Sequence, residues 1–159
     1  MISTSYATGD VRVGPSSGGG GLVGGAQGGV LNSYAEGAVS GSSGAFIGGL
    51  VGDFNGYAEY SYSTGAVSGG AKSYVGGFIG YDEEDEHGEF VDCYWDTDKS
   101  GVTNLSQGAG NIANDPGITG QTTSKLKAGL PTGFDPSIWN EKAKVNGSLP
   151  YLLSNSPAK

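Results

Sequence analysis

Short apolar runs, each set between glycines, recur along the first part of the chain. "GGLVG" begins at Gly20 and again at Gly48, and "GGFIG" begins at Gly76. A second pattern opens with a serine-tyrosine pair: "SYATGDV" from position 5, "SYAEGAV" from 33 and "SYSTGAV" from 61. Both patterns advance by one constant step, from 20 to 48 to 76 and from 5 to 33 to 61. Two patterns in one register indicate an internal repeat.

Each copy of the repeat contains three runs with the character of a β-strand. They lie around "SYATGDVRV", around the "GGLVG" pattern, and just before the next serine-tyrosine pair. Three short strands joined by turns predict one coil of a parallel β-helix, or β-solenoid. We therefore expect an all-β fold of about three to four stacked coils. A β-sandwich or meander and a disordered chain are the alternatives.

Coils that stack about 4.8 Å apart align equivalent side chains in columns. The apolar positions of the repeat predict three such columns, which are Leu22, Leu50 and Phe78, then Val23, Val51 and Ile79, and then Val11, Val39 and Val67. Glycine reaches positive φ without steric cost. Gly9, Gly37 and Gly65 are therefore the expected corner residues.

A column of tyrosines is the other regular feature of the repeat. A degenerate fourth copy, "CYWDTDKSG", begins at Cys93 and extends this column, whose members are Tyr6, Tyr34, Tyr62 and Tyr94. Strict alternation places Tyr34 on the same side as Glu36, but a bend at either residue reverses that. The sequence leaves open whether the tyrosines face the core or the outside.

The last interval of the repeat, from Tyr62 to Tyr94, is longer than the two intervals before it. The turn after the glycine pattern is "GAQ" in the first copy and "DFN" in the second, but "YDEEDEH" in the third. Insertions in repeat proteins map to one exposed face, which is often the binding face. The candidate binding loop is therefore Tyr81, Asp82, Glu83, Glu84, Asp85, Glu86 and His87.

Two acidic segments offer oxygen ligands of the kind that calcium prefers. In the loop they are Asp82, Glu83, Asp85 and Glu86. In "DTDKSG" they are Asp96, Asp98 and Ser100, spaced like the start of a calcium loop, although Gln107 stands where a bidentate glutamate belongs. The competing interpretations are a solvated acidic loop for the first segment and the ordinary end of a repeat array for the second. No other cofactor is expected.

The composition changes after Gly101, where prolines appear and the glycine pattern ends. We divide the chain into repeats at 1–101 and a capping segment at 102–159. "TTSKLKAGL" (122–130) opens with hydroxyl residues suited to an N-cap and predicts one short helix. The end of a solenoid exposes strand edges and core, so a cap is physically required. An independent binding segment is the alternative.

The net charge and the short apolar runs of the sequence argue against several classes of partner. The chain has sixteen acidic residues against eight basic ones, and its net charge is −8. This balance disfavours nucleic acids and anionic membrane surfaces. The sequence contains no apolar run of membrane-spanning length, and the first residues lack the pattern of a signal peptide. We interpret the chain as an excerpt.

The pairing of "GGLVG" with "NSYAEGAVSG" (32–41) resembles the GLUG repeat. This repeat occurs in large secreted bacterial surface proteins similar to filamentous haemagglutinins, and in stalks of some immunoglobulin-A-cleaving peptidases. The resemblance covers residues 3–101, and "YWDTDKSG" and "GSLPYLL" resemble the ends of such arrays. It implies a right-handed β-helix and export to the cell exterior by upstream sequence not present here. It also implies adhesive or stalk roles, and it supplies no catalytic residues.

The predicted function is a non-enzymatic stalk or adhesion module of an exported bacterial surface protein. Its expected partners are a host or environmental receptor or glycan, and upstream repeats of a longer parent chain. A carbohydrate-binding or carbohydrate-cleaving β-helix is the alternative. Cleavage by such enzymes uses paired carboxylates, but Glu36 aligns with Thr8 and Thr64, and Asp53 with Gly25 and Tyr81. We therefore predict no catalytic residues.

Overall fold

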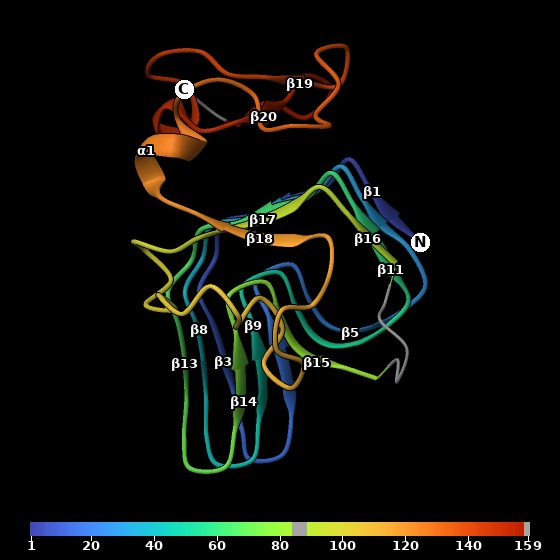
Figure 1. Cartoon of the computed structure of the whole chain (residues 1–159), viewed down its shortest axis with the longest axis vertical. Helices are drawn as coiled ribbons and strands as arrows, with labels where there is room; N and C mark the ends of the chain where they lie inside the picture. The colour runs from blue at the N-terminus through green and yellow to red at the C-terminus, as the bar shows by residue number, and fades with distance from the viewer. Residues whose placement is uncertain (84–88, 158–159) are drawn as a thin grey trace.

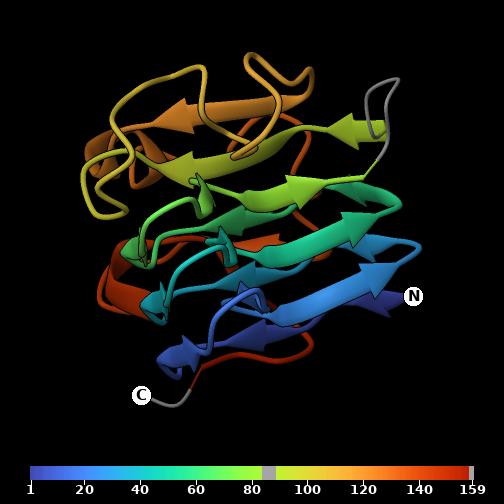
Figure 2. The ribbon, with the colours of Figure 1, turned by 90° about the horizontal axis from the view of Figure 1, so that it is seen from below.

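Each complete coil of the protein is built from five short strands, where the sequence predicts three runs. The computed structural model describes residues 1–83 and 89–157, and its parallel strands form a β-solenoid of about four turns (Figures 1 and 2). The first coil is β1 (Ile2–Ser3), β2 (Tyr6–Ala7), β3 (Val11–Val13), β4 (Gly18–Gly20) and β5 (Val23–Gln27). The predicted all-β solenoid is confirmed. Turns split two of the predicted runs, which accounts for the extra strands.

The later coils repeat this order of strands. The second coil is β6 (Val30–Leu31), β7 (Tyr34–Ala35), β8 (Val39–Gly41), β9 (Phe46–Gly48) and β10 (Val51–Asn55). The third is β11 (Tyr57–Glu59), β12 (Tyr62–Ser63), β13 (Val67–Gly69), β14 (Tyr74–Gly76) and β15 (Ile79–Asp82). The chain then continues through β16 (Glu89–Val91), β17 (Cys93–Asp96) and β18 (Ile118–Gln121).

Equivalent strands pair in parallel and give five stacked sheets. Sheet A orders β1-β6-β11-β16, sheet B β18-β17-β12-β7-β2, sheet C β13-β8-β3, sheet D β14-β9-β4 and sheet E β15-β10-β5. The register follows the repeat, since Val51 pairs with both Val23 and Ile79. The insertion also lies where the sequence places it. The step from Phe54 to its partner Asp82 is the regular one, whereas the step from Tyr57 to its partner Glu89 is longer.

The main core lies between sheets A, B and E. Two of the predicted apolar columns enter it: Leu50, Phe78, Val51 and Ile79 are fully buried, and Leu22 and Val23 of the first coil are partly buried against it. The third column packs in a smaller core between sheets C and D, made of Val39, Ala45 and Ile47 with Val11, Val13, Val67 and Val75 against them. The cross-section therefore has two lobes, and sheets C and D form the lower one in Figure 1.

Glycines join the two lobes, because sheets D and E approach each other without side chains between them. A Cβ at Gly48 would overlap the backbone of Val51 in its own coil and of Gly80 in the next. Gly20 and Gly76 stand in the same position in their coils. Only glycine allows backbones this close, so the "GGLVG" pattern marks a contact between sheets.

The predicted role of Gly9, Gly37 and Gly65 as positive-φ corners is wrong. None of the three adopts positive φ. A Cβ at Gly37 would overlap the carbonyl of Gly9, and one at Gly65 the carbonyl of Gly37, so close approach between coils requires glycine there. Positive φ occurs instead in two other columns, which are Thr4, Asn32, Tyr60 and Asp92, and Ser16, Gly44 and Lys72.

The tyrosine column faces away from the main core. The rings of Tyr6, Tyr34 and Tyr62 stack with centroids 4.9 and 5.1 Å apart and nearly parallel planes. Tyr94 keeps the strand register but packs against Phe134. Leu126, Phe134, Trp139, Leu149 and Leu152 complete this outer cluster. The side chains of the C-terminal part thus settle the question that the sequence left open.

Two parts of the chain after Gly101 cover different surfaces. A closing segment, residues 102–117, lies on the last coil, where Phe78 and Ile79 donate backbone hydrogen bonds to Gly108. A cover segment, residues 122–157, contains α1 (Thr123–Leu126), β19 (Trp139–Asn140), the 3-10 turn Asn146–Ser148 and β20 (Tyr151–Leu152). It lies over sheet B and returns toward the first coils (Figure 2). The predicted short helix is present, with Thr122 as N-cap.

Candidate functional site

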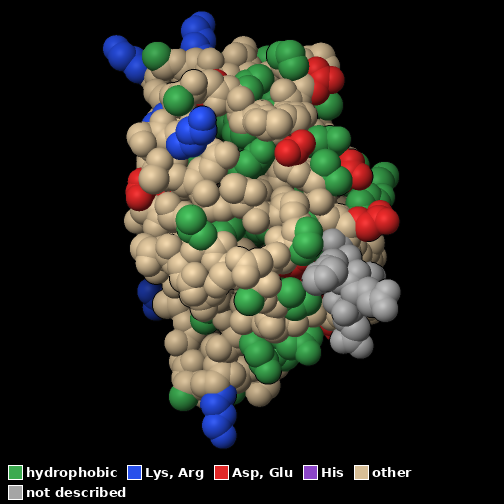
Figure 3. Space-filling model, viewed as in Figure 1, with side chains coloured by type: hydrophobic (Ala, Val, Ile, Leu, Met, Phe, Trp, Pro, Cys, Tyr) green, Lys and Arg blue, Asp and Glu red, His purple; other side chains and the backbone are tan. Residues whose placement is uncertain are grey.

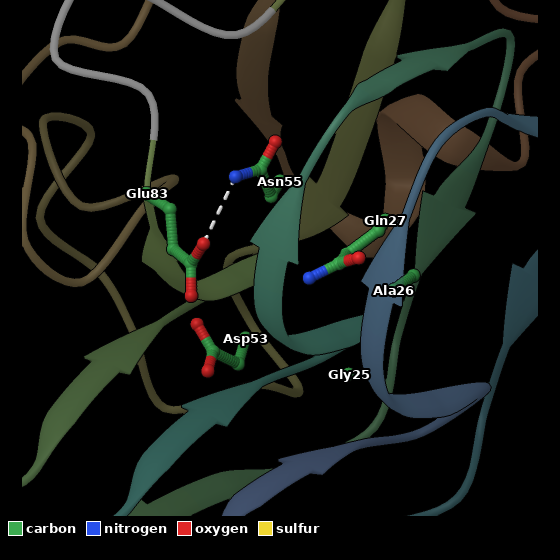
Figure 4. Close-up of a pocket in the computed structure, with 6 residues that line it drawn as sticks. All are labelled: Gly25, Ala26, Gln27, Asp53, Asn55 and Glu83. Carbon is green, nitrogen blue, oxygen red and sulfur yellow. Dashed lines mark hydrogen bonds between the residues drawn. The ribbon is translucent and has the colours of Figure 1, made fainter.

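A hollow of about 270 Å³ opens on the outer face of sheet E. It is lined by Gly25, Ala26, Gln27, Asp53, Asn55 and Glu83 (Figure 4). The sequence of β10 explains why polar groups collect here. Val51 and Phe54 enter the main core, and Asp53 and Asn55 alternate with Phe54 and face outward. The strand therefore carries core and site residues on opposite faces.

Two carboxylates face each other across this hollow. Figure 4 shows the Asp53 and Glu83 carboxylates turned toward one another, although the two residues lie on neighbouring coils. Asn55 donates a hydrogen bond from Nδ2 to Glu83 Oε2 at 3.0 Å. Asp53 Oδ1 is buried and has no hydrogen-bond partner among the described residues. Burial raises the pKa of Asp53 above its usual value, and the negative charge of Glu83 adds to this.

Three aromatic rings continue the same face. Tyr81 pairs with Asp53 in register, so the two side chains are neighbours on the outer surface of sheet E. The Tyr81 ring lies 4.9 Å from Phe46 and 5.1 Å from Tyr74, both of which belong to sheet D. Tyr74 is 42% exposed. The outer faces of sheets D and E thus meet in one surface, with rings on one side and carboxylates and amides on the other.

This surface combines the groups that recognise a polyhydroxylated ligand. An aromatic face packs against the C–H side of a sugar ring, and carboxylates and amides bond to its hydroxyls. We call the hollow together with the rings beside it the sheet D/E groove, defined by Phe46, Tyr74, Tyr81, Asp53, Asn55 and Glu83. On the side of the molecule that Figure 3 shows, Lys and Arg lie mainly near the top and bottom.

The structure brings only part of the predicted binding loop to this groove. Tyr81 and Glu83 contribute to it, whereas Asp82 points inward and is 2% exposed. Glu84, Asp85, Glu86 and His87 lie outside the described residues. Among the described residues, no group of three or more histidine, cysteine, aspartate or glutamate side chains could hold a metal ion.

The residues of "DTDKSG" form a hydrogen-bonded turn. Asp96 is fully buried, and its Oδ1 accepts the backbone N–H groups of Asp98 and Lys99. Its carboxylate also accepts the Thr123 hydroxyl, and Asp98 accepts the Thr123 backbone N–H at 2.9 Å. Ser100 accepts a hydrogen bond from Val102. These oxygens therefore join the turn to the start of α1.

Sequence reasoning missed the pairing of Asp53 with Glu83. A comparison along the columns finds only that Asp53 aligns with Gly25 and Tyr81, as the strand register confirms. Glu83 lies on the next coil, two residues after Tyr81, which is the register partner of Asp53. Such diagonal positions share one face of a sheet, so a comparison of diagonal neighbours finds the pair. Phe46 and Tyr74, which are paired in register one repeat apart, carry the signal for the aromatic part.

Comparisons of the chain with protein-family models, with curated proteins and with solved structures found no match in any of the three. In the part of the chain that the structure describes, no helix has the length and apolar character needed to cross a membrane.

Proposed function

We propose that this protein is a non-enzymatic attachment module that binds a glycan in the sheet D/E groove. The observation that carries the proposal is the continuous outer surface in which the rings of Phe46, Tyr74 and Tyr81 adjoin the carboxylates of Asp53 and Glu83. Four of these groups lie on paired strands, and Glu83 directly follows β15 and donates its backbone N–H to Phe54, so little ordering accompanies binding.

The wider role proposed for the chain is that of a stalk or adhesin on an exported bacterial surface protein. A solenoid holds its outer loops and faces at fixed spacing, and its coils form an extended surface for contact. The resemblance of residues 3–101 to GLUG repeats supports a location at the cell surface or outside the cell. Repeated contacts of this kind gain avidity when several modules engage one surface.

The charge of the groove limits the class of glycan. The hollow is lined by two ionisable side chains, the carboxylates of Asp53 and Glu83, and by the amide of Asn55 beside them. A sugar that carries carboxylates or sulfates would meet like charges, which disfavours binding. We therefore propose a neutral glycan or an amino-sugar glycan as the ligand.

A panel of oligosaccharides tests this proposal. Neutral cello-oligosaccharides and amino-sugar chito-oligosaccharides are compared with polygalacturonate and hyaluronan fragments by isothermal titration. Binding to a neutral or amino-sugar member is expected, and Tyr74→Ala should weaken it about tenfold, the effect of losing roughly 1.4 kcal/mol of ring contact. Leu105→Ala, which shortens a side chain that is 65% exposed, is the control. Binding to acidic fragments alone would overturn the proposal.

Cleavage of a glycan is the second candidate, because glycosidases also use two facing carboxylates. The raised pKa of Asp53 is the property of a general acid. Incubation of every bound oligosaccharide with the protein, followed by chromatography, distinguishes the candidates. We expect no new reducing ends. Turnover that disappears in both Asp53→Asn and Glu83→Gln would replace attachment with catalysis as the function.

A further inference from the structure

The hollow of the sheet D/E groove runs along the axis of the solenoid. Its lining crosses three coils, with Gly25, Ala26 and Gln27 from the first, Asp53 and Asn55 from the second and Glu83 from the third. Three coils extend over two coil spacings, about 10 Å, whereas residues 25–27 extend over about 7 Å of strand. The long direction of the hollow is therefore the stacking direction.

Three polar side chains follow this direction, one from each coil. Gln27 pairs in register with Asn55, and Glu83 follows Asp82, the partner of Phe54, so it holds the same place in the third coil. All three are exposed, and Figure 4 shows them side by side on neighbouring coils. We call Gln27, Asn55 and Glu83 the polar ladder. It presents one amide or carboxylate to a ligand at each step of about 4.8 Å.

The aromatic side of the groove follows the same direction in the second and third coils. Phe46 and Tyr74 pair in register, and their ring centroids lie 5.8 Å apart. The equivalent residue of the first coil is Gly18, which has no side chain. The rings thus mark two coils, and in the first coil Gln27 is the polar side chain that lines the hollow.

We propose that the ligand is a linear oligosaccharide that lies along the solenoid axis, with one sugar unit on each coil. This inference rests on the proposed function and specifies the shape of the glycan. A pyranose ring with its glycosidic oxygen is about as long as one coil spacing. The hydroxyls of successive units then bond to successive members of the polar ladder, while Phe46 and Tyr74 pack against the C–H faces of two neighbouring units.

The alternative is a single terminal sugar, held only at the end of the groove where Tyr74, Tyr81 and Glu83 lie. The structure favours the linear chain because the hollow continues to the first coil, where Gly25 places no side chain across it. A single sugar would also leave Gln27 without a contact. The two possibilities differ in how affinity depends on the length of the ligand.

The test measures affinity against ligand length. The whole chain is titrated calorimetrically with the cello-oligosaccharide and chito-oligosaccharide series, each from the monosaccharide to the hexasaccharide. Affinity should rise about tenfold or more from the monosaccharide to the trisaccharide and then level off, because three coils contribute to the hollow.

A variant at the first coil tests the direction of the chain. Gln27→Ala should weaken the binding of the trisaccharide and of longer oligomers about threefold, the effect of one net hydrogen bond. It should leave the monosaccharide and the disaccharide unchanged. Gln121→Ala, the same change in β18 of sheet B, is the matched control and should alter no affinity. Circular dichroism of both variants checks the fold.

The outcomes separate this inference from the proposed function. Equal affinity for the monosaccharide and the longer oligomers would overturn the linear chain and leave the attachment role intact. An effect of Gln27→Ala that is the same at every length, or absent at every length, would also overturn it. If no member of either series binds, both the linear chain and the attachment role fail.

Discussion

Glycine determines how closely neighbouring backbones approach in this protein. The structure contains glycines with no room for a side chain and glycines with open space around them. At Gly48 a side chain would collide with Val51 and with the next coil, whereas at Gly9 no atom lies within 4 Å of the Cβ position. The glycine-flanked pattern is therefore required where sheets D and E meet, and glycine is not required at every position of the repeat.

A pair of alanine substitutions measures this difference. Gly48→Ala should lower the free energy of unfolding by more than about 2 kcal/mol, because backbone atoms must move to admit the methyl group. Gly9→Ala, with open space around it, should change stability by less than about 1 kcal/mol. Urea denaturation of both variants provides the comparison. Equal effects would show that close packing between sheets D and E is not what the glycine serves.

The apolar columns were predictable from the sequence, and the corners were not. Leu50, Val51 and their equivalents recur with an apolar character that only a common core explains. The corner positions are filled by Thr4, Asn32 and Tyr60, which share a backbone conformation and no chemistry. Each of them donates its backbone N–H to a carbonyl of the next coil, and such contacts between coils leave no local pattern in the sequence.

At the scale of elements, the cover segment and sheet B depend on each other. The stacked tyrosines would form an exposed aromatic strip if nothing covered them. Trp139 contacts Tyr34 and Tyr62 and donates from Nε1 to Asn32 Oδ1 at 3.1 Å. Tyr62 in turn donates to the Pro150 carbonyl at 2.6 Å. The sequence predicted the helix of this segment, but not its place, because its contacts join residues that are far apart in the chain.

Trp139 packs the cover segment against the stacked tyrosines of sheet B. It is fully buried, so Trp139→Ala should cost about 3–5 kcal/mol of stability and expose the tyrosines. Leu153→Ala, at a side chain that is 45% exposed, is the control and should cost less than about 1 kcal/mol. Thermal melting and near-ultraviolet circular dichroism report both. A Trp139→Ala protein with unchanged melting would contradict the packing of this segment.

We expect Glu36 to make the stability of the protein depend on pH, because its carboxylate is packed against the cover segment. Burial raises its pKa above 4.5, although Asn146 donates a hydrogen bond to it at 2.7 Å. The folded state therefore holds this proton more tightly than the unfolded state, and stability falls as the pH rises from about 4.5 through the raised pKa. Glu36→Gln should remove this part of the pH dependence, which is below about 1 kcal/mol because the group is partly exposed.

Urea denaturation of the parent chain and of Glu36→Gln at about pH 4 and pH 7, on either side of this window, measures the effect. The same pH dependence in both proteins would refute the assignment.

At the scale of the whole molecule, the period of the repeat determined the fold class and the place of the insertion. Both follow from one physical requirement, that equivalent residues of stacked coils pair in register. The sheet D/E groove does not follow from the period. It is formed by contacts between residues of different sheets and coils, such as Phe46 and Tyr81. These contacts depend on how the two lobes pack against each other.

The proposed attachment role rests on ligand binding at that groove. Chemical-shift mapping of the isotope-labelled protein with the best neutral or amino-sugar oligosaccharide of the panel tests it most directly. The account predicts that the shifts of β9, β10, β14 and β15 change, while those of β19 and β20 in the cover segment stay constant. Changes confined to the cover segment, or no change with any oligosaccharide of the panel, would contradict it.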